Sequence, residues 1–203
     1  MTIPATILAG GRSSRMGGGD KCLLPLAGRP LLAQVVERLR PQVGALALNA
    51  NGDPGRFAAF ALPVVADPIG GYLGPLAGVL AALTWHRDQG FAGDWVATVA
   101  ADTPLIPRDL VARLAAARDG VMIVLAASHG RDHPTIALWS TTLATELEAL
   151  LRSDTPKGAR AWVARHRWRS VDFPDAPGGF DPFANVNTPE GLAALEHAIC
   201  DGM

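Results

Sequence analysis

The sequence predicts an α/β protein built on a mostly parallel, doubly wound sheet. Short apolar runs of strand length alternate with longer segments of helical periodicity. Buried apolar strands separated by amphipathic helices are typical of a parallel sheet that is covered on both faces. Gly10, Asn49, Asp67 and Asp102 each follow one of the first four predicted strands or end it. Ligands of such sheets bind at the carboxyl ends of the strands, so we expect these four residues to share one rim.

The individual elements follow from apolar runs, helical spacing and proline positions. Strands are predicted at residues 3–8, 43–49, 62–67, 95–102, 121–127 and 135–139, and helices at 30–40, 75–86, 107–118, 142–151 and 189–199. In the first helix, the fixed φ of Pro30 suits a first turn, Leu31 and Val35 begin a helical repeat, and Pro41 ends it. The Gly/Pro-rich stretches 67–75 and 173–182 are predicted to be loops over the rim.

Composition and charge limit the classes of protein that the chain can belong to. It has 203 residues, of which 49% are hydrophobic, and we expect one domain over residues 1–203. The net charge of −1 argues against a general nucleic-acid-binding surface. The start has no cationic segment and its apolar run breaks at Gly10, so we expect a soluble, cytoplasmic protein without a signal peptide or membrane span. Cys22 and Cys200 lack metal-site or disulfide spacing, which predicts structural thiols.

The segment ILAGGRSSRMGGGDK at residues 7–21 has the composition of a phosphate-binding loop. It contains five glycines, two arginines and a lysine, yet it matches neither the Walker motif nor the dinucleotide-binding fingerprint. Gly10 and Gly11 allow backbone N–H groups to approach an anion closely. Arg15 and Lys21 add positive charge. The alternative is a glycine loop with solvated charges, and its position directly after the first strand favours phosphate binding.

Several segments, matched in order along the chain, resemble one family. They are residues 8–21, 48–51, 75–78 (after Asp67), 102–104, 131–138 and 185–190. Together they closely resemble the molybdenum cofactor guanylyltransferases, which are nucleotidyltransferases with a three-layer, Rossmann-like fold. The resemblance implies transfer of GMP from GTP to the phosphate of molybdopterin, with release of pyrophosphate. It implies GTP contacts from Leu8, Ala9, Gly10, Lys21, Asn49, Asp67 and Asp102, and Mg²⁺ as cofactor on Asp102.

The residues support this interpretation to different degrees. Asp102 at the end of a buried strand suits a hard cation, although it is also placed to cap the helix predicted from Pro107. Asp67 and Asn49 suit a base or ribose, but both residue types are also common in turns. The related cytidylyltransferases usually carry LAAG where this chain has LAGG. We therefore expect Gly10 to favour GTP over CTP.

The second substrate, the molybdopterin phosphate, has only regional signals. Asn185 and Asn187 lie two residues apart in an extended segment and would point the same way toward a pterin; the alternative is an Asx-turn that caps the helix predicted from Pro189. Residues 131–133 either line the rim or carry ordinary surface charge. Residues 152–169 hold six Lys or Arg residues against Asp154. They are either a solvated helix face or a positive wall that attracts an anionic pterin or an acidic protein.

The predicted mechanism needs no general base, because the attacking phosphate oxygen is already anionic at neutral pH. Lys21 and Arg15 would offset charge on the leaving pyrophosphate, and Asp102 would hold Mg²⁺. The alternatives are a cytidylyl- or sugar-phosphate nucleotidyltransferase of the same fold, and a non-catalytic protein that delivers molybdopterin. We expect GTP and molybdopterin as substrates, transient contacts with molybdopterin-synthesis, insertion or chaperone proteins, no nucleic acid, and a monomer.

Overall fold

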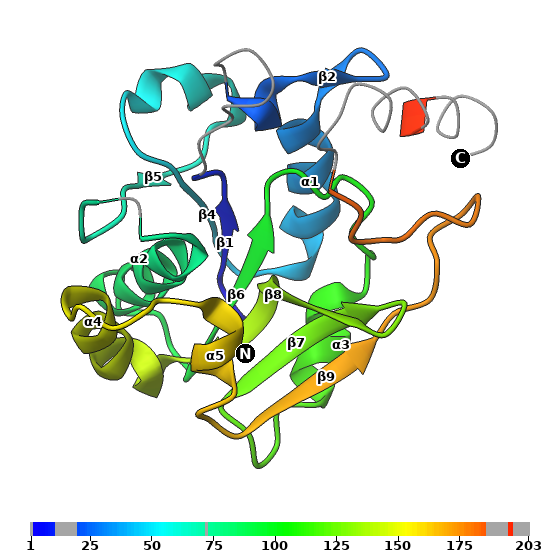
Figure 1. Ribbon diagram of the computed structural model, residues 1–203. Coiled ribbons are helices and arrows are strands. Elements are labelled where there is room, and N and C mark those ends of the chain that lie inside the picture. The colour runs from blue at the N-terminus through cyan, green and yellow to red at the C-terminus, as the bar shows by residue number, and fades with distance from the viewer. Residues whose placement is uncertain (1, 11–19, 72, 186–194, 197–203) are drawn as a thin grey trace.

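The computed structural model describes residues 2–10, 20–71, 73–185 and 195–196. Its centre is a seven-stranded sheet in the order β5-β4-β1-β6-β8-β7-β9 (Figure 1). The strands are β1 (Ala5–Leu8), β4 (Leu46–Asn49), β5 (Val64–Val65), β6 (Trp95–Ala100), β7 (Ile123–Ser128), β8 (Arg131–Ser140) and β9 (Trp168–Asp172). Only β8 runs antiparallel to its neighbours in this sheet, β6 and β7, and the remaining pairs are parallel. The predicted mostly parallel sheet is therefore confirmed.

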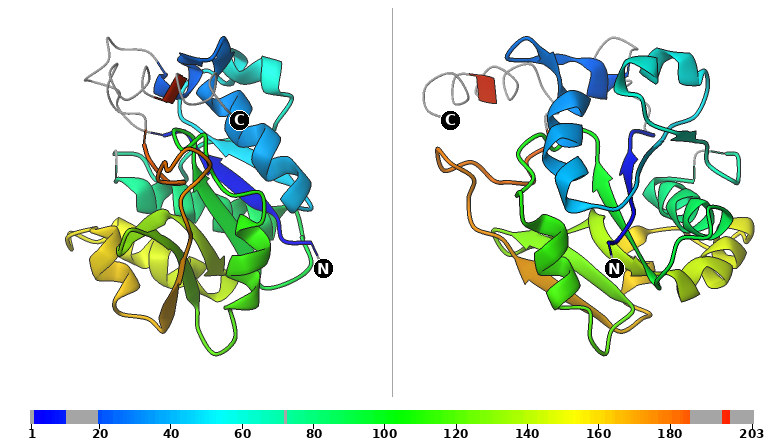
Figure 2. Two further views of the ribbon diagram at one scale, coloured as in Figure 1. Left: turned by 90° about the vertical axis from the view of Figure 1, so that its right-hand side faces the viewer. Right: turned by 180° about the vertical axis from the view of Figure 1, so that it is seen from behind.

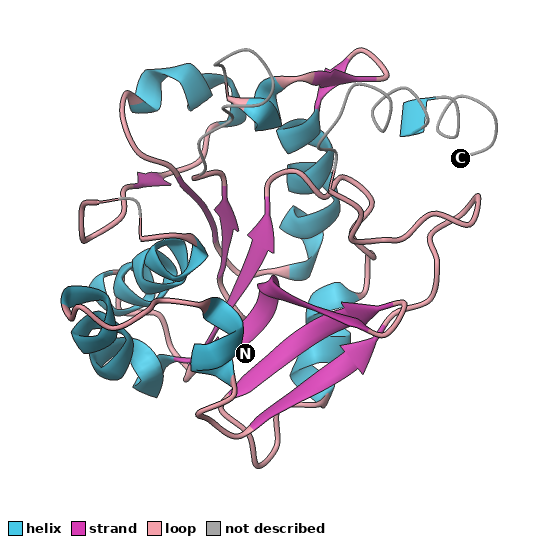
Figure 3. Ribbon diagram, viewed as in Figure 1, coloured by secondary structure: helices cyan, strands magenta, loops and turns pink. Residues whose placement is uncertain are grey.

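Helices cover both faces of the sheet and give the molecule three layers (Figures 2 and 3). On one face, α1 (Leu31–Leu39) and α3 (Leu110–Ala116) pack with alternate residues of β1, β4 and β6. On the other face, α2 (Pro75–Asp88), α4 (Ala144–Arg152) and α5 (Ala159–Val163) pack with β7 and β8. This arrangement confirms the three-layer, Rossmann-like fold.

The N-terminal helical region follows the predicted pattern closely. The strands β2 (Pro25–Leu26) and β3 (Arg29–Pro30) form a hairpin. Ala27 and Gly28 at its turn have φ of 50° and 73°, as a two-residue hairpin turn requires. The helix α1 then buries Leu31 and Val35, and the short 3-10 helix η2 (Arg40–Gln42) replaces it at Pro41. Three further 3-10 helices are η1 (Lys21–Leu23), η3 (Pro54–Phe60) and η4 (Thr141–Leu143).

The largest differences from the sequence prediction lie in the second half of the chain. The strand β9 and the helix α5 were not predicted, because β9 is an edge strand with mostly exposed side chains and carries part of the basic stretch 152–169. The strand β8 begins at Arg131 instead of residue 135. It accommodates Pro134, which has no N–H to donate, because the register with β7 shifts between Leu125 and Ala126.

Two other expectations concern the ends of elements and the membrane. The strand β5 has two residues instead of the predicted six. Of the helix predicted at 189–199, only Leu195 and Glu196 are described; both are helical, and Leu195 packs with Leu26 and Leu31. In the described part of the chain, no helix is both long and apolar enough to cross a membrane.

Candidate active site

A pocket of about 320 Å³ lies at the carboxyl ends of β1, β4 and β6, beside the first turn of α2. The arrows of β1 and β6 point to this edge of the sheet (Figure 1). Its lining consists of Leu8, Ala9, Gly10, Asp20, Lys21, Cys22, Asn49, Asp67, Gly74, Pro75, Gly78, Ala100, Ala101, Asp102, Thr135 and Asn185. The four residues expected to share one rim, from four separate segments, therefore line one pocket.

Most of the predicted site residues meet in this pocket. Those present are Leu8, Ala9, Gly10, Lys21, Asn49, Asp67, Asp102 and Asn185. The predicted residues Gly11, Arg15 and Asn187 lie outside the described residues. The sequence prediction did not include Asp20, Gly74, Gly78 or Thr135. Gly74 and Gly78 belong to the loop and helix opening that follow Asp67, and that spacing was the available signal for them.

An ion pair between Lys21 and Asp102 joins the end of the glycine-rich segment to the end of β6. Lys21 Nζ lies 2.5 Å from Asp102 Oδ2, and the side chains are 17% and 23% exposed. Asp102 does not cap a helix, because α3 begins at Leu110 with Asp109 at its N-cap. The capping alternative for Asp102 is therefore excluded. A cation and a carboxylate that meet at a pocket wall have the chemistry to bind a phosphate and a phosphate-bound metal ion, respectively.

Asn49, Asn51 and Asp67 form a hydrogen-bonded cluster at the ends of β4 and β5. Asn49 Nδ2 donates to Asp67 Oδ1 at 2.9 Å and to the Val65 carbonyl at 3.1 Å, while Asn51 Nδ2 donates to Asp67 Oδ2 at 2.7 Å. Because these two contacts occupy the amide nitrogen of Asn49, its Oδ1 faces away from Asp67 and Val65. Asp67 is thus held by two side-chain amides, and Asn51 is a supporting residue that sequence reasoning missed.

Of the two glycines beside Asn49, only Gly78 is required for close packing. A Cβ on Gly78 would lie 2.6 Å from Asn49 Oδ1 and 3.0 Å from Leu8 Cδ2, which is too close for either atom to stay in place. A Cβ on Gly10 would lie 3.5 Å from the same oxygen, an ordinary contact. Gly78 therefore lets the first turns of α2 pack against β1 and β4, whereas Gly10 has space beside it.

The N-terminus of α2 contributes partial positive charge to the pocket. Gly74 caps this 14-residue helix with φ of 76°, a conformation that favours glycine, and Pro75 occupies its first turn. Both residues line the pocket. Backbone N–H groups at a helix N-terminus favour anions, so this wall adds to the charge of Lys21.

Arg56 on η3 connects the segment that carries Lys21 to the residues that follow β4. Its Nε lies 2.6 Å from Asp20 Oδ2, and its Nη2 donates to the Asn51 carbonyl at 2.6 Å. The guanidinium also lies over the Phe57 ring, 4.7 Å from the centroid. Asp20 directly precedes Lys21, so Arg56 ties the lysine-bearing segment to the end of β4. Nothing in the sequence pattern identified this contact, because it depends on how η3 folds back.

Cys22 lines the pocket, but its thiol is unreactive. Its side chain is 4% exposed, and burial, together with the negative charge of Asp20, raises the pKa of its thiol to about 12. A thiol with such a pKa stays protonated at neutral pH and is a poor nucleophile. Cys22 is therefore a structural residue, as predicted; Cys200 lies outside the described residues.

A second hydrogen-bonded cluster holds the segment that brings Asn185 into the pocket. Ser128 Oγ donates to Asp181 Oδ1 at 2.7 Å and lies 2.8 Å from His133 Nε2. The Phe183 backbone N–H also donates to Asp181 Oδ1, at 2.9 Å. If the Ser128 proton is directed at Asp181, His133 donates from Nε2 to the serine oxygen. Burial lowers the pKa of His133 below its usual range, which favours this neutral form.

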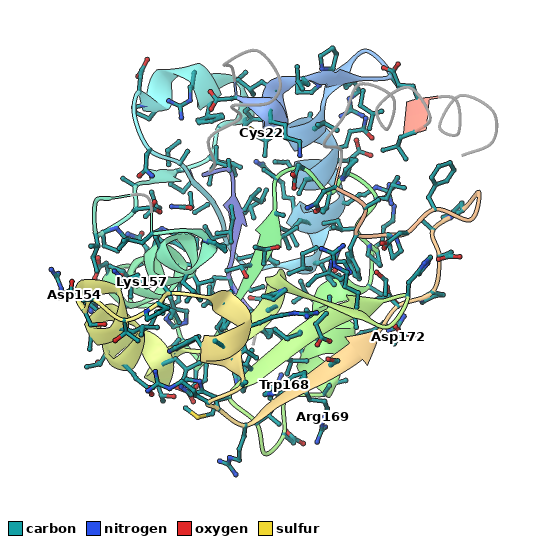
Figure 4. All side chains as sticks on the ribbon, in the orientation of Figure 1. Cys22, Asp154, Lys157, Trp168, Arg169 and Asp172 are labelled. Atoms are coloured by element: carbon teal, nitrogen blue, oxygen red, sulfur yellow. The ribbon has the colours of Figure 1, made fainter. Side chains whose placement is uncertain are left out.

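The basic stretch 152–169 does not line the pocket. Arg152 pairs with Glu148 at 2.8 Å and Arg165 with Glu146 at 3.7 Å, both on α4. Figure 4 shows Lys157 and Asp154 beside α4, away from Trp168 and Arg169 on β9. These residues are therefore spread over α4, α5, β9 and the segments between them, and they do not form one helix face. In the segment 131–133, Asp132 lines a separate groove and His133 belongs to the Ser128 cluster.

The pocket fits a metal ion that is brought by a phosphate ligand. Among the residues that the structure describes, no group of three or more His, Cys, Asp or Glu side chains is placed to hold a metal ion. Mg²⁺ is commonly bound through one or two protein carboxylates together with substrate phosphates and water. Asp102, a partly exposed carboxylate at the pocket wall, matches that donor set.

A Rossmann-like sheet whose strand ends carry these groups defines a nucleotidyltransferase, and comparisons with known proteins agree. The family model described as the MobA-like NTP transferase domain matches residues 5–171. The molybdenum cofactor guanylyltransferase of Rhodopseudomonas palustris (strain BisB5) is 51% identical over 195 residues, 95% of this chain and 92% of the relative. The protein of that name from Bradyrhizobium sp. (strain ORS 278) is 48% identical over 196 residues, 96% of this chain and 92% of the relative. The chain therefore belongs to the molybdenum cofactor guanylyltransferases of the MobA-like NTP transferase family.

Solved structures share the fold at lower identity. Molybdopterin-guanine dinucleotide biosynthesis protein A from Archaeoglobus fulgidus superposes with a TM-score of 0.73 at 21% identity, over 99% of this chain and 100% of that one. A Mycobacterium tuberculosis H37Rv protein solved as a complex with manganese has a TM-score of 0.66 at 19% identity, over 98% of this chain and all of that one. These likenesses confirm the nucleotidyltransferase fold.

Proposed function

We propose that the protein transfers GMP from GTP to the terminal phosphate of molybdopterin and releases pyrophosphate. The observation that carries this proposal is the Lys21–Asp102 ion pair, which lies in the same pocket as Asn49 and Asp67. The names of relatives about half identical to this chain support the choice of nucleotide and acceptor. The chain's enzyme class, a nucleotidyltransferase, removes the non-catalytic delivery protein from consideration.

In the proposed complex, the phosphates of GTP lie between the residues around Gly10, Lys21 and the N-terminus of α2. The Lys21 ammonium and the helix N-terminus offset negative charge on the β- and γ-phosphates. Arg15 is proposed to contribute in the same way. Asp67, held by Asn49 and Asn51, accepts hydrogen bonds from the base or ribose. Leu8, Ala9, Gly10 and Gly11 complete the nucleotide contacts.

The reaction requires positioning and charge neutralisation more than proton transfer. A phosphate oxygen of molybdopterin forms a bond to the α-phosphorus of GTP, while the bond from that phosphorus to the bridging oxygen of pyrophosphate breaks. The electron pair leaves on pyrophosphate, which Lys21 stabilises. The nucleophile is already anionic, which agrees with the lack of a nucleophile–base pair among the described pocket residues.

Mg²⁺ is the proposed cofactor, and Asp102 is the residue that would hold it. When bound, the ion would neutralise phosphate charge and polarise the α-phosphorus. The Lys21–Asp102 contact holds the carboxylate at the pocket wall before nucleotide arrives. The manganese complex of a protein with this fold supports a divalent cation without specifying which one.

Pyrophosphate release tests the proposal directly. The purified protein is supplied with GTP and Mg²⁺, with and without molybdopterin, and parallel reactions contain CTP in place of GTP. We expect release only with GTP and molybdopterin together. Release with CTP at equal or higher kcat/KM would instead identify a cytidylyltransferase. Release with a sugar phosphate in place of molybdopterin would identify a sugar-phosphate nucleotidyltransferase.

A further inference from the structure

The described walls of the nucleotide pocket carry more negative than positive charge. The charged residues among the described lining are Asp20, Lys21, Asp67 and Asp102. Lys21 contacts Asp102, and two side-chain amides hold Asp67. The phosphates of the proposed ligand, GTP, bring further negative charge, which nearby carboxylates repel. Binding of a polyphosphate is therefore favoured by a positive charge beside Asp20.

Arg56 supplies this positive charge from outside the pocket lining. Its Nε lies 2.6 Å from Asp20 Oδ2, as an ion pair and not an aligned hydrogen bond. The two side chains are 30% and 26% exposed, so solvent screens the pair only in part. In Figure 1, η3 (cyan) lies beside the segment that carries Asp20 and Lys21 (blue). Because Arg56 is not among the residues that line the pocket, it neutralises Asp20 without taking up space that the nucleotide needs.

The loop after β4 holds the guanidinium of Arg56 in place. Its Nη2 donates to the Asn51 carbonyl at 2.6 Å, and its Nη1 donates to the Asp53 carbonyl at 3.2 Å. The group also lies over the ring of the buried Phe57, 4.7 Å from the centroid. Gly52, with φ of 84°, leaves room for it, since a Cβ there would lie 3.0 Å from Nη1. Arg56 is therefore a fixed charge, and a lysine lacks the planar fork that meets several such partners at once.

The thiol of Cys22, which lines the pocket, responds to both charges of this ion pair. Burial is the main reason that its pKa is raised to about 12. The negative charge of Asp20 acts on this pKa in the same direction as burial, whereas the positive charge of Arg56 acts against it. The charge of Asp20 is therefore felt inside the pocket, and Arg56 counteracts it there.

A purely structural role is the alternative interpretation of Arg56. The side chain of its partner Asn51 donates to Asp67 Oδ2 at 2.7 Å and accepts from the Asp67 N–H at 2.9 Å. Loss of Arg56 would then loosen the cluster that we assign to the base or ribose, and it would weaken binding of a nucleoside and of its triphosphate alike. Loss of charge compensation would instead weaken binding of the triphosphate alone. The direct contact with Asp20 at the pocket favours charge compensation.

We propose that Arg56 is a positioning residue for the nucleotide. It neutralises Asp20 and holds this carboxylate toward η3, so that its charge does not oppose the Lys21 ammonium at the phosphates. The inference rests on the proposed function, because it takes GTP as the nucleotide. It deepens that function by assigning part of the charge balance of the phosphate site to an arginine outside the pocket lining.

Calorimetric binding of GTP with Mg²⁺, and of guanosine, tests the proposal without turnover. We expect Arg56→Gln, whose amide still has a donor for the Asn51 carbonyl, to weaken GTP binding by about 5–30-fold at low salt. Added salt should reduce this loss, because it screens the uncompensated carboxylate. Guanosine carries no phosphate, so its affinity should stay within about twofold of that for the wild type.

Removal of the Asp20 charge should rescue Arg56→Gln. In the double variant with Asp20→Asn and Arg56→Gln, we expect GTP to bind within about threefold of its affinity for Asp20→Asn alone, because no uncompensated carboxylate remains. Arg56→Lys keeps the charge and loses the fork, so its GTP affinity should fall by only about 2–5-fold. Arg40→Gln is the matched control: Arg40 Nη2 donates to the Phe60 carbonyl at 3.3 Å, at the other end of η3, and its loss should leave the GTP affinity unchanged.

Thermal unfolding checks that each variant is folded, and Arg56→Lys, with and without Asp20→Asn, replaces Arg56→Gln if that variant does not fold. Wild-type affinity for GTP in folded Arg56→Gln would overturn the inference. Equal weakening of GTP and guanosine binding, or a double variant that binds GTP as weakly as Arg56→Gln, would also overturn it and identify a structural role. If the variants behave as expected but the wild type releases no pyrophosphate from GTP and molybdopterin, the role of Arg56 stands and the proposed function fails.

Discussion

The two halves of the sheet organise polar side chains in different ways. In β5-β4-β1-β6, all neighbours are parallel, so polar residues that follow each strand meet at one edge. In β8-β7-β9, β8 runs the other way and its register shifts. In this half, Thr135 of β8 lines the pocket, and Ser128 of β7 holds Asp181 in the segment that carries Asn185. The polar groups of the parallel half can therefore be predicted from strand ends, whereas those of the antiparallel half depend on a hairpin, a bulge and the segment after β9.

The largest effects should come from the ion pair of the parallel half. We expect Lys21→Ala and Asp102→Asn each to lower kcat by about 10²–10³-fold or more, because each removes a charge that acts on the reacting phosphates. Initial rates of pyrophosphate release over a range of Mg²⁺ concentrations measure this, and Asp102→Asn should also require more Mg²⁺. The exposed pair Arg29–Glu37, at 2.8 Å, provides the control: Arg29→Ala should leave kcat near the wild-type value. Near-normal turnover in Lys21→Ala and Asp102→Asn would contradict both assignments.

This contrast also explains which parts the sequence could predict. Asn49, Asp67 and Asp102 were predictable because apolar strands are easy to recognise and their ends must converge in a parallel sheet. The strand β9 was not, because its pattern of exposed, charged residues is that of an edge and resembles a solvated helix face. The contacts of Arg56 with Asp20 and Asn51 also escaped prediction. They depend on tertiary folding of a 3-10 helix, which local periodicity does not encode.

The next largest effect should come from Gly78→Ala. The added methyl would lie 2.6 Å from Asn49 Oδ1, so Asn49 must move and Asp67 loses one of its two amide donors. We expect the affinity for GTP to fall by roughly 10–100-fold and the free energy of unfolding to fall by about 1–3 kcal/mol. Calorimetric titration with GTP and chemical denaturation measure the two effects. Gly70→Ala, where a Cβ would meet nothing within 4 Å, is the matched control, and equal behaviour of the two variants would refute the packing role of Gly78.

A smaller and more selective effect is expected in the antiparallel half from Asp181→Ala. The substitution removes the acceptor for Ser128 and for the Phe183 N–H, so the segment that carries Asn185 loses its anchor. We expect the KM for molybdopterin to rise about 5–10-fold while the affinity for GTP is nearly unchanged. Steady-state kinetics with each substrate varied in turn separates the effect on molybdopterin from the effect on GTP. Asp175→Ala, which removes only the exposed contact with His129, should behave as the wild type; equal losses for both substrates in Asp181→Ala would show that the two halves do not act separately.

Gly10→Ala should change nucleotide preference without disturbing the fold. The added Cβ would make an ordinary 3.5 Å contact with Asn49 Oδ1, so the free energy of unfolding should change by less than about 0.5 kcal/mol. We expect the ratio of kcat/KM for GTP over CTP to fall by a few-fold to about tenfold, since the methyl occupies space that we assign to the purine. An unchanged ratio would remove Gly10 from base selection and leave it only a loop residue.

The smallest effect should be the pH dependence of stability that His133 contributes. Burial lowers the pKa of His133 in the folded protein below the unfolded value of 6.5, and the positive charge of Arg131 adds to this, while Asp181 and Asp132 act against it. The unfolded chain then takes up a proton first as the pH falls, so stability present above about pH 6.5 is lost as the pH drops through the folded pKa.

His133→Gln keeps an Nε2 donor for Ser128 but cannot titrate. We expect it to reduce the loss of stability between about pH 6.5 and 5 by less than roughly 1 kcal/mol, because the site is only half-buried. Urea unfolding at several pH values measures the slope. His129→Gln is the opposite control, since Asp175 raises the pKa of His129 and its removal should lower stability on the acid side; a His133→Gln slope identical to the wild type would mean that the Ser128 cluster does not depend on a neutral histidine.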